Sequence, residues 1–78
     1  MKKGLTQKQV KVFNFIKNYI DEYSYSPSYE EIKKHIGLAS KSGVHNHIIL
    51  LSERNWITRI RGKARSVRIA KWNMLLFL

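Results

Sequence analysis

Residues 28–54 read SYEEIKKHIGLASKSGVHNHIILLSER, a pattern that predicts two short helices joined by a tight turn. Ser28 and Glu31 have the spacing of a capping box, in which each side chain accepts a hydrogen bond from the other residue's backbone N–H, so we expect a helix to begin here. Gly37 suits the end of that helix, because glycine readily adopts the left-handed conformation that follows many helices. Ser40 is the N-cap candidate of the next helix. Such a pair is typical of a helix-turn-helix, although helical hairpins in general give a similar pattern.

The helix after Ser40 is expected to run from about residue 41 to residue 54. Val44, Ile48 and Leu51 recur at helical spacing and predict its inward stripe. His47 lies beside this stripe, and we interpret it as a partly buried packing residue.

An earlier helix is expected to begin at Thr6. Thr6 and Gln9 form a second capping-box pattern. Apolar and aromatic residues then recur at helical spacing and predict one buried face. These residues are Val12, Phe13, Ile16, Tyr19, Ile20 and Tyr23.

A basic hairpin is expected after the third helix. Asn55 can end that helix in the left-handed conformation. Residues 56–61 are rich in β-formers, residues 62–65 indicate a turn, and residues 66–70 alternate as a strand does. A hairpin after a helix-turn-helix gives the order of a winged helix. The expected fold class is therefore mainly α with a small β-hairpin (α+β), a three-helix winged helix-turn-helix.

The chain has 78 residues, no cysteine and a formal net charge of +10. This length leaves room for one domain, which we assign to residues 1–70, followed by an apolar tail at residues 71–78. All five acidic residues lie between Asp21 and Glu53, and only basic charges follow. A polyanion is the simplest partner for such a surface. Charge alone fits DNA, RNA and a basic protein without a nucleic-acid partner equally well.

Catalysis and metal binding find little support in the sequence. Without cysteine there is no thiol nucleophile and no thiolate ligand. The acidic pairs at residues 21–22 and 30–31 lie near expected helix ends, where capping and solvation account for them. His45 and His47 point roughly 200° apart on a helix, so they cannot share a metal ion. We therefore expect no enzyme activity, no metal and no cofactor.

Membrane insertion is not expected either. Lys2 and Lys3 are not followed by an apolar run, so no signal peptide is predicted. The apolar residues 72–78 are far fewer than the roughly 20 that a membrane span needs. A cytoplasmic location is the expectation.

The outer face of the third helix is a candidate surface for reading DNA bases. Opposite its inner stripe, Ser42, Gly43, His45 and Asn46 offer short polar groups and a close backbone approach near the helix start, where recognition helices contact base edges. Asparagine can pair with adenine through two hydrogen bonds. An ordinary solvated face is the alternative. Ser40 and Lys41 lie where a phosphate would meet N–H groups and positive charge.

The hairpin tip carries Arg61, Lys63 and Arg65, which suit the DNA backbone or minor groove. Arg59 and Arg68 fall on the strand bodies, where solvation accounts for them.

Recognition of single strands is disfavoured, because it uses surface aromatic residues and most aromatics here fall on the expected buried face. Tyr25, Tyr29 and Trp56 remain available for stacking.

Several stretches together resemble the LexA (SOS-response) repressor family over residues 5–69 without a gap. The resemblance is carried by Leu5-Thr6, Val12-Phe13, Ile16, Pro27-Ser28, Glu31-Ile32, the run from Gly37 to Ile48, Trp56-Ile57 and the run from Arg65 to Ile69.

The resemblance implies a winged helix that binds palindromic operators as a dimer, with half-sites like GAAC and GTTC. It implies base contacts from Ser40, Ser42, Gly43, His45 and Asn46. Backbone contacts are assigned to Ser28, Lys41, Arg54, Arg61, Lys63 and Arg65.

Three departures from the family pattern stand out. Asn55 replaces a usual glycine, and Trp56 replaces a smaller aliphatic residue. The family's self-cleaving Ser/Lys peptidase domain, which also dimerises, has no counterpart in these residues. We therefore expect no self-cleavage of this chain.

The apolar tail at residues 72–78 suggests a homodimer contact, or packing onto the domain's own core. Two other functions stay open, a protein-interaction module and a basic RNA-binding protein.

Overall fold

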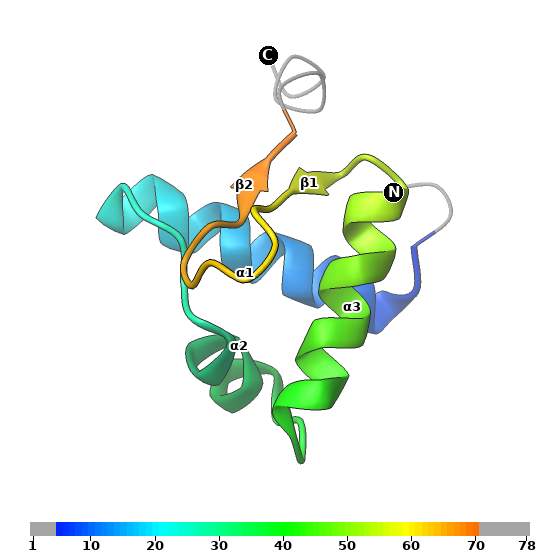
Figure 1. The fold of residues 1–78 in the computed structure, drawn as a ribbon. Coiled ribbons are helices and arrows are strands. Elements are labelled where there is room, and N and C mark those ends of the chain that lie inside the picture. Colours follow the sequence, from blue (N-terminus) through cyan, green and yellow to red (C-terminus); the bar gives the residue numbers. More distant parts are fainter. Residues whose placement is uncertain (1–4, 71–78) are drawn as a thin grey trace.

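The computed structural model describes residues 5–70 as three helices followed by a small two-stranded sheet. The elements are α1 (Gln7–Tyr23), α2 (Tyr29–Ile36), α3 (Lys41–Glu53), β1 (Ile57–Thr58) and β2 (Arg68–Ile69). α1 runs behind the other elements, α2 lies below the sheet, α3 rises from beside α2 to the level of the sheet, and the loop between the strands descends toward α2 (Figure 1). The predicted winged helix-turn-helix is confirmed. The expected tail at residues 71–78 lies outside the described residues.

Both predicted capping boxes are formed. The backbone N–H of Gln9 donates to Thr6 Oγ1 at 3.1 Å, and that of Thr6 donates to Gln9 Oε1 at 3.0 Å. At α2 the backbone N–H of Glu31 donates to Ser28 Oγ at 3.2 Å, and that of Ser28 donates to Glu31 Oε1 at 2.7 Å. Each box satisfies backbone donors that the first turn of a helix otherwise leaves unpaired.

The core lies where the three helices and the sheet meet. The predicted inner stripe of α3 is confirmed, since Val44, Ile48 and Leu51 are fully buried. The core cluster comprises these three residues with Val12, Phe13, Ile16, Ile32, Ile57 and Val67. The predicted buried face of α1 is wrong at its end, because Tyr23 is 49% exposed. Tyr23 belongs to the last turn of α1, beyond the part of the helix that contributes to the core cluster.

Left-handed residues separate the elements as expected. Gly37 (φ 82°) ends α2, and Asn55 (φ 63°) follows α3. The last helix is one residue shorter than predicted and ends at Glu53, with Arg54 as its C-cap.

The hairpin has much shorter strands than the sequence predicts, with two residues in each. They are antiparallel, with Ile57 opposite Ile69 and Thr58 opposite Arg68. Beyond the ladder, Ser66 Oγ accepts from the backbone N–H of Ile60 at 3.0 Å and donates to its carbonyl at 3.1 Å. A side chain thus replaces strand pairing at the base of the loop, which we call the wing (residues 59–66).

Trp56 connects the hairpin to the core. It is partly buried, and its ring meets that of Phe13 edge to face with centroids 5.7 Å apart. The larger side chain at this position therefore packs against α1.

Candidate nucleic-acid interface

The turn between α2 and α3 fixes how α3 is presented. The backbone N–H groups of Gly37 and Leu38 both donate to the Lys33 carbonyl, at 2.9 and 3.1 Å, which closes the end of α2. Leu38 packs against the core. The turn is therefore held at the end of α2 and by the packing of Leu38, just before α3 begins.

The outer face of α3 is polar and exposed, as predicted. Ser42, His45 and Asn46 are exposed, and Lys41 stands beside them at the first helical position. The His45 and Tyr29 rings lie 6.1 Å apart, centroid to centroid, across the gap between α3 and α2. These side chains offer hydrogen-bond donors and acceptors to a partner.

Gly43 has a different environment from its neighbours. A Cβ at this position would lie 3.6 Å from Leu38 Cδ1, an ordinary van der Waals contact. The missing side chain is thus directed toward the turn. Only the backbone of Gly43 can serve the outer face.

Ser40 occupies the N-cap position of α3 with extended backbone (φ −147°, ψ 160°). Within the described chain its side chain makes no capping hydrogen bond, unlike Thr6 and Ser28. The first turn of α3 therefore lacks the internal acceptor that the other two helices have.

A groove of about 440 Å³ separates the wing from the starts of α2 and α3. It brings together five of the residues assigned to DNA from the sequence, namely Ser28, Lys41, His45, Lys63 and Arg65. Its remaining lining is Tyr29, Glu30, Arg59, Gly62 and Ala64. The charged residues of the groove are mostly basic, since Glu30 is its one acidic lining residue and forms an ion pair with Lys33 at 3.4 Å.

Two groove residues were missed by the sequence argument. Arg59 was assigned to a solvated strand body, but it lines the groove because β1 ends at Thr58. Tyr29 lies at the first position of α2 and was considered only for stacking on single strands. The sequence predicts a strand that continues through Arg59, so it gives no sign that this residue lies in the loop beside the groove.

The other assigned residues lie elsewhere. Arg54 is at the far end of α3, and Arg61 is exposed on the wing without lining the groove. Ser42 and Asn46 are exposed on α3 outside the groove.

Arg65 is bound within the protein. Its Nη1 donates to Glu31 Oε1 at 2.9 Å and to the Ser26 carbonyl at 3.1 Å. The guanidinium carbon also lies 5.3 Å from the centroid of the Tyr25 ring. Arg65 is at the wing tip, as the sequence predicts, but these partners leave no local pattern in the sequence.

Glu31 receives hydrogen bonds on both carboxylate oxygens. Oε1 accepts from the Ser28 backbone N–H and from Arg65, and Oε2 accepts from Tyr19 Oη at 3.1 Å. The backbone N–H of Ser28, followed by the Arg65 guanidinium, lowers the pKa of Glu31 to about 2. Both groups stabilise the ionised form.

His47 is half-buried on α3, as predicted for a packing residue. Burial, with a smaller contribution from the Lys8 charge, lowers the pKa of His47. We expect it to be neutral near pH 7.

Comparison with known proteins identifies the family. A model of the LexA DNA-binding domain matches residues 2–66. The chain belongs to the LexA DNA-binding domain family. The groove and the exposed face of α3 are therefore features of a domain that binds double-stranded DNA.

Curated relatives are LexA repressors. The repressor of Thermosipho melanesiensis is 48% identical over 69 residues, which are 88% of this chain and 34% of that protein. Those of Cereibacter sphaeroides and Erythrobacter litoralis are 42% and 45% identical over 67 residues, 86% of this chain and 29% of each relative. The chain thus spans about a third of the length of the curated relatives it matches.

Residues 5–70 hold no group of three or more side chains suited to a metal ion. Within the same range, no helix has both the length and the apolar character needed to cross a membrane.

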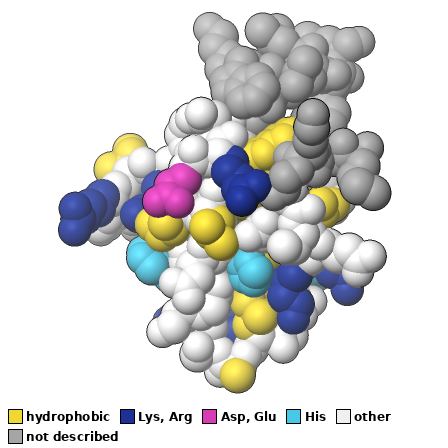
Figure 2. Space-filling view, turned by 90° about the vertical axis from the view of Figure 1, so that its right-hand side faces the viewer, with side chains coloured by type: hydrophobic (Ala, Val, Ile, Leu, Met, Phe, Trp, Pro, Cys, Tyr) yellow, Lys and Arg dark blue, Asp and Glu magenta, His cyan; other side chains and the backbone are white. Residues whose placement is uncertain are grey.

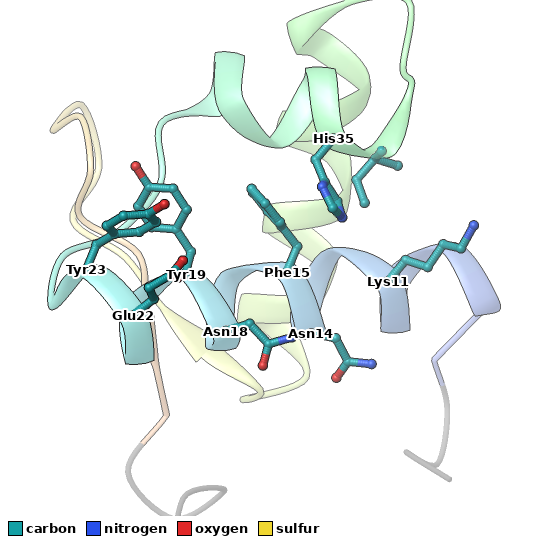
Figure 3. Close-up of a pocket in the computed structure, with 9 residues that line it drawn as sticks. Lys11, Asn14, Phe15, Asn18, Tyr19, Glu22, Tyr23 and His35 are labelled. Carbon is teal, nitrogen blue, oxygen red and sulfur yellow. The ribbon is translucent and has the colours of Figure 1, made fainter.

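A second hollow, of about 490 Å³, lies between α1 and α2 and shares no lining residue with the groove. In it Phe15 and His35 point toward one another, and Tyr19 and Tyr23 lie together further along α1 (Figure 3). The Phe15 and His35 rings stack with centroids 4.2 Å apart. On the face shown in Figure 2, hydrophobic side chains form separate small areas, and basic side chains are scattered over a largely uncharged surface.

Proposed function

We propose that this chain represses transcription by placing α3 in the major groove of an operator, with the wing along the DNA backbone. In this arrangement Ser40, Ser42, His45 and Asn46 face base edges, and the backbone of Gly43 passes close to them. The observation that carries the proposal is the exposed polar face at the start of α3, adjacent to a basic groove. This is the part of a recognition helix that reads bases.

Backbone contacts come from both sides of the groove. Lys41 and Lys63 line it from α3 and the wing, so a phosphate between them would meet two positive charges. Ser28 Oγ already accepts the capping bond from Glu31, but its hydroxyl proton can still donate to a phosphate. Arg54 and Arg61 would extend these contacts along the duplex.

We further propose that two copies bind a palindromic operator. Their recognition helices would enter successive major grooves, spaced by roughly 34 Å or a multiple of it. Removing residues 72–78 tests whether the apolar tail makes the dimer contact. Unchanged mass in solution and unchanged operator affinity would show that it does not.

The experiment that tests this function is selection of bound duplexes from a random DNA pool at near-physiological salt. We expect an enriched palindrome with half-sites like GAAC and GTTC. Affinity for the selected duplex should fall with salt by a slope of roughly −0.9 per phosphate contact. A single enriched half-site would instead indicate a monomer.

An RNA duplex and a single strand of equal length serve as competitors in the same assay. RNA binding has one structural argument, since Tyr23 and Tyr25 are 49% and 47% exposed and aromatic rings can stack on splayed bases. No enrichment of any DNA sequence, with tighter binding to RNA, would overturn the proposed function. If no DNA sequence is enriched and the chain binds neither DNA nor RNA, the remaining function is a protein-interaction module.

A further inference from the structure

The wing depends on contacts other than strand pairing for its position. The two strands that flank it have two residues each, and an isolated hairpin is at best marginally stable in water. Val67 is buried next to β2, but residues 61–65 are all exposed. The tip of the wing therefore needs a further attachment to keep a fixed distance from α3.

Arg65 provides that attachment. Its guanidinium reaches Glu31 and the Ser26 carbonyl, 34 and 39 residues away in the sequence. Charge-assisted hydrogen bonds of this kind are stronger than neutral ones. Arg65 also has φ 52°, a backbone conformation that residues other than glycine rarely adopt and that persists where surrounding contacts hold it.

Glu31, which accepts the bond from Arg65, is itself held by contacts at the start of α2 and from α1. Glu31 is held by the capping box of α2 through Ser28, and by the hydroxyl of Tyr19 from α1. A bond from Arg65 to this carboxylate therefore ties the wing to the start of α2 and to α1 together.

We propose that Arg65 is a positioning residue, which sets the width of the groove between the wing and α3 through Glu31 and does not itself pair with a DNA phosphate. The carboxylate already neutralises its charge, so Arg65 has little to gain from a phosphate. The role in DNA binding rests on the proposed function, whereas the link between wing and α2 does not.

Two charge-removing variants separate this role from a direct DNA contact. Arg65→Gln breaks the link from the wing side. Glu31→Gln breaks the ion pair but keeps a side chain that can complete the capping box. Lys63→Gln is the matched control. It removes one positive charge from the same groove, as Arg65→Gln does, but Lys63 does not bind Glu31.

The first readout needs no DNA. In ¹⁵N relaxation of the free protein, we expect Arg65→Gln and Glu31→Gln each to increase the fast motion of amides 61–64, and Lys63→Gln to leave it unchanged. Amides of α3 report whether the variants remain folded. Unchanged wing mobility in both folded variants overturns the link, whether or not the chain binds DNA.

The second readout is affinity for the selected duplex, measured by fluorescence anisotropy. We expect Arg65→Gln and Glu31→Gln each to weaken binding about tenfold, within the usual range for coupling between two sites. The double variant should bind no more weakly than either single one, because both break the same link. If Arg65 contacted phosphate directly, Glu31→Gln would release its charge and strengthen binding. That result, or a looser wing with unchanged affinity, overturns the positioning role.

Should the wild type bind no duplex at all, the proposed function fails and the positioning role fails with it. The relaxation data would still establish or exclude the link itself.

Discussion

Helices α2 and α3 both have a serine at the N-cap position, but the two serines make different contacts. Ser28 and Glu31 close a capping box with bonds of 2.7 and 3.2 Å. Ser40 has the extended backbone of an N-cap, yet its side chain makes no capping bond in the part of the chain that is described. In α2 the serine hydroxyl accepts from a backbone N–H of the first turn, whereas Ser40 leaves the first turn of α3 without that side-chain acceptor. A helix N-terminus of this kind favours a phosphate.

The largest effect is expected at the outer face of α3. Asn46→Ala should remove about 1–3 kcal/mol of discrimination at one base position, because asparagine can make two hydrogen bonds to adenine. Comparing duplexes selected by the variant and the wild type measures this. Asn18→Ala is the matched control, since Asn18 is exposed on α1. An unchanged preference for Asn46→Ala would show that α3 is oriented differently on DNA.

The two serines give the next prediction. Ser28→Ala should lower the free energy of unfolding by about 1 kcal/mol, since it opens a formed capping box. Ser40→Ala should change it by less than about 0.5 kcal/mol, because no capping bond is lost. Urea denaturation of both variants measures the difference. Equal losses of unfolding free energy in the two variants would mean that Ser40 caps α3 in solution as Ser28 caps α2.

A smaller gain in stability is expected from Gly43→Ala. Alanine favours a helix over glycine by roughly 0.5–1 kcal/mol, and the new methyl group would make an ordinary contact with Leu38. We expect higher stability with operator affinity essentially unchanged, measured by denaturation and anisotropy. A more stable variant that binds DNA weakly would indicate that the new methyl group meets the DNA, contrary to its direction toward Leu38.

The stability that Glu31 of α2 and His47 of α3 contribute should be lost in different pH ranges. The lowered pKa of Glu31 favours its ionised form, so the stability it contributes is present above pH 4.5 and is lost as pH falls toward about 2. The lowered pKa of His47 favours the neutral form, so its contribution is present above pH 6.5 and is lost as pH falls below that value.

Thermal unfolding across this range checks both signs. His47→Gln should remove the loss that begins near pH 6.5, and His45→Gln, at an exposed position, should not. Greater stability at acid pH than at neutral pH would contradict both assignments.

Features set by neighbouring residues were predictable from the sequence. The two capping boxes join residues three apart, and Gly37 and Asn55 act through their own backbone preference. The stripe of α3 follows from helical periodicity, and the exposed face opposite it follows from the same spacing. These features sufficed for the fold and for most of the candidate surface.

Features set by distant residues were not predictable in this way. The bond between Arg65 and Glu31 spans 34 residues, and no local pattern records it. β-forming residues around Ile60 predicted a longer strand, but Ser66 takes over the hydrogen bonds that a ladder would use. Tyr23 fits the helical period yet lies past the core, so periodicity alone misplaced it.

The most direct test of the account is an NMR titration of the ¹⁵N-labelled chain with the selected duplex. We predict that amide shifts change most at residues 41–46 and 61–65, at the start of α3 and in the wing. Changes concentrated instead around Phe15, Tyr19 and His35, which line the hollow between α1 and α2, would contradict it.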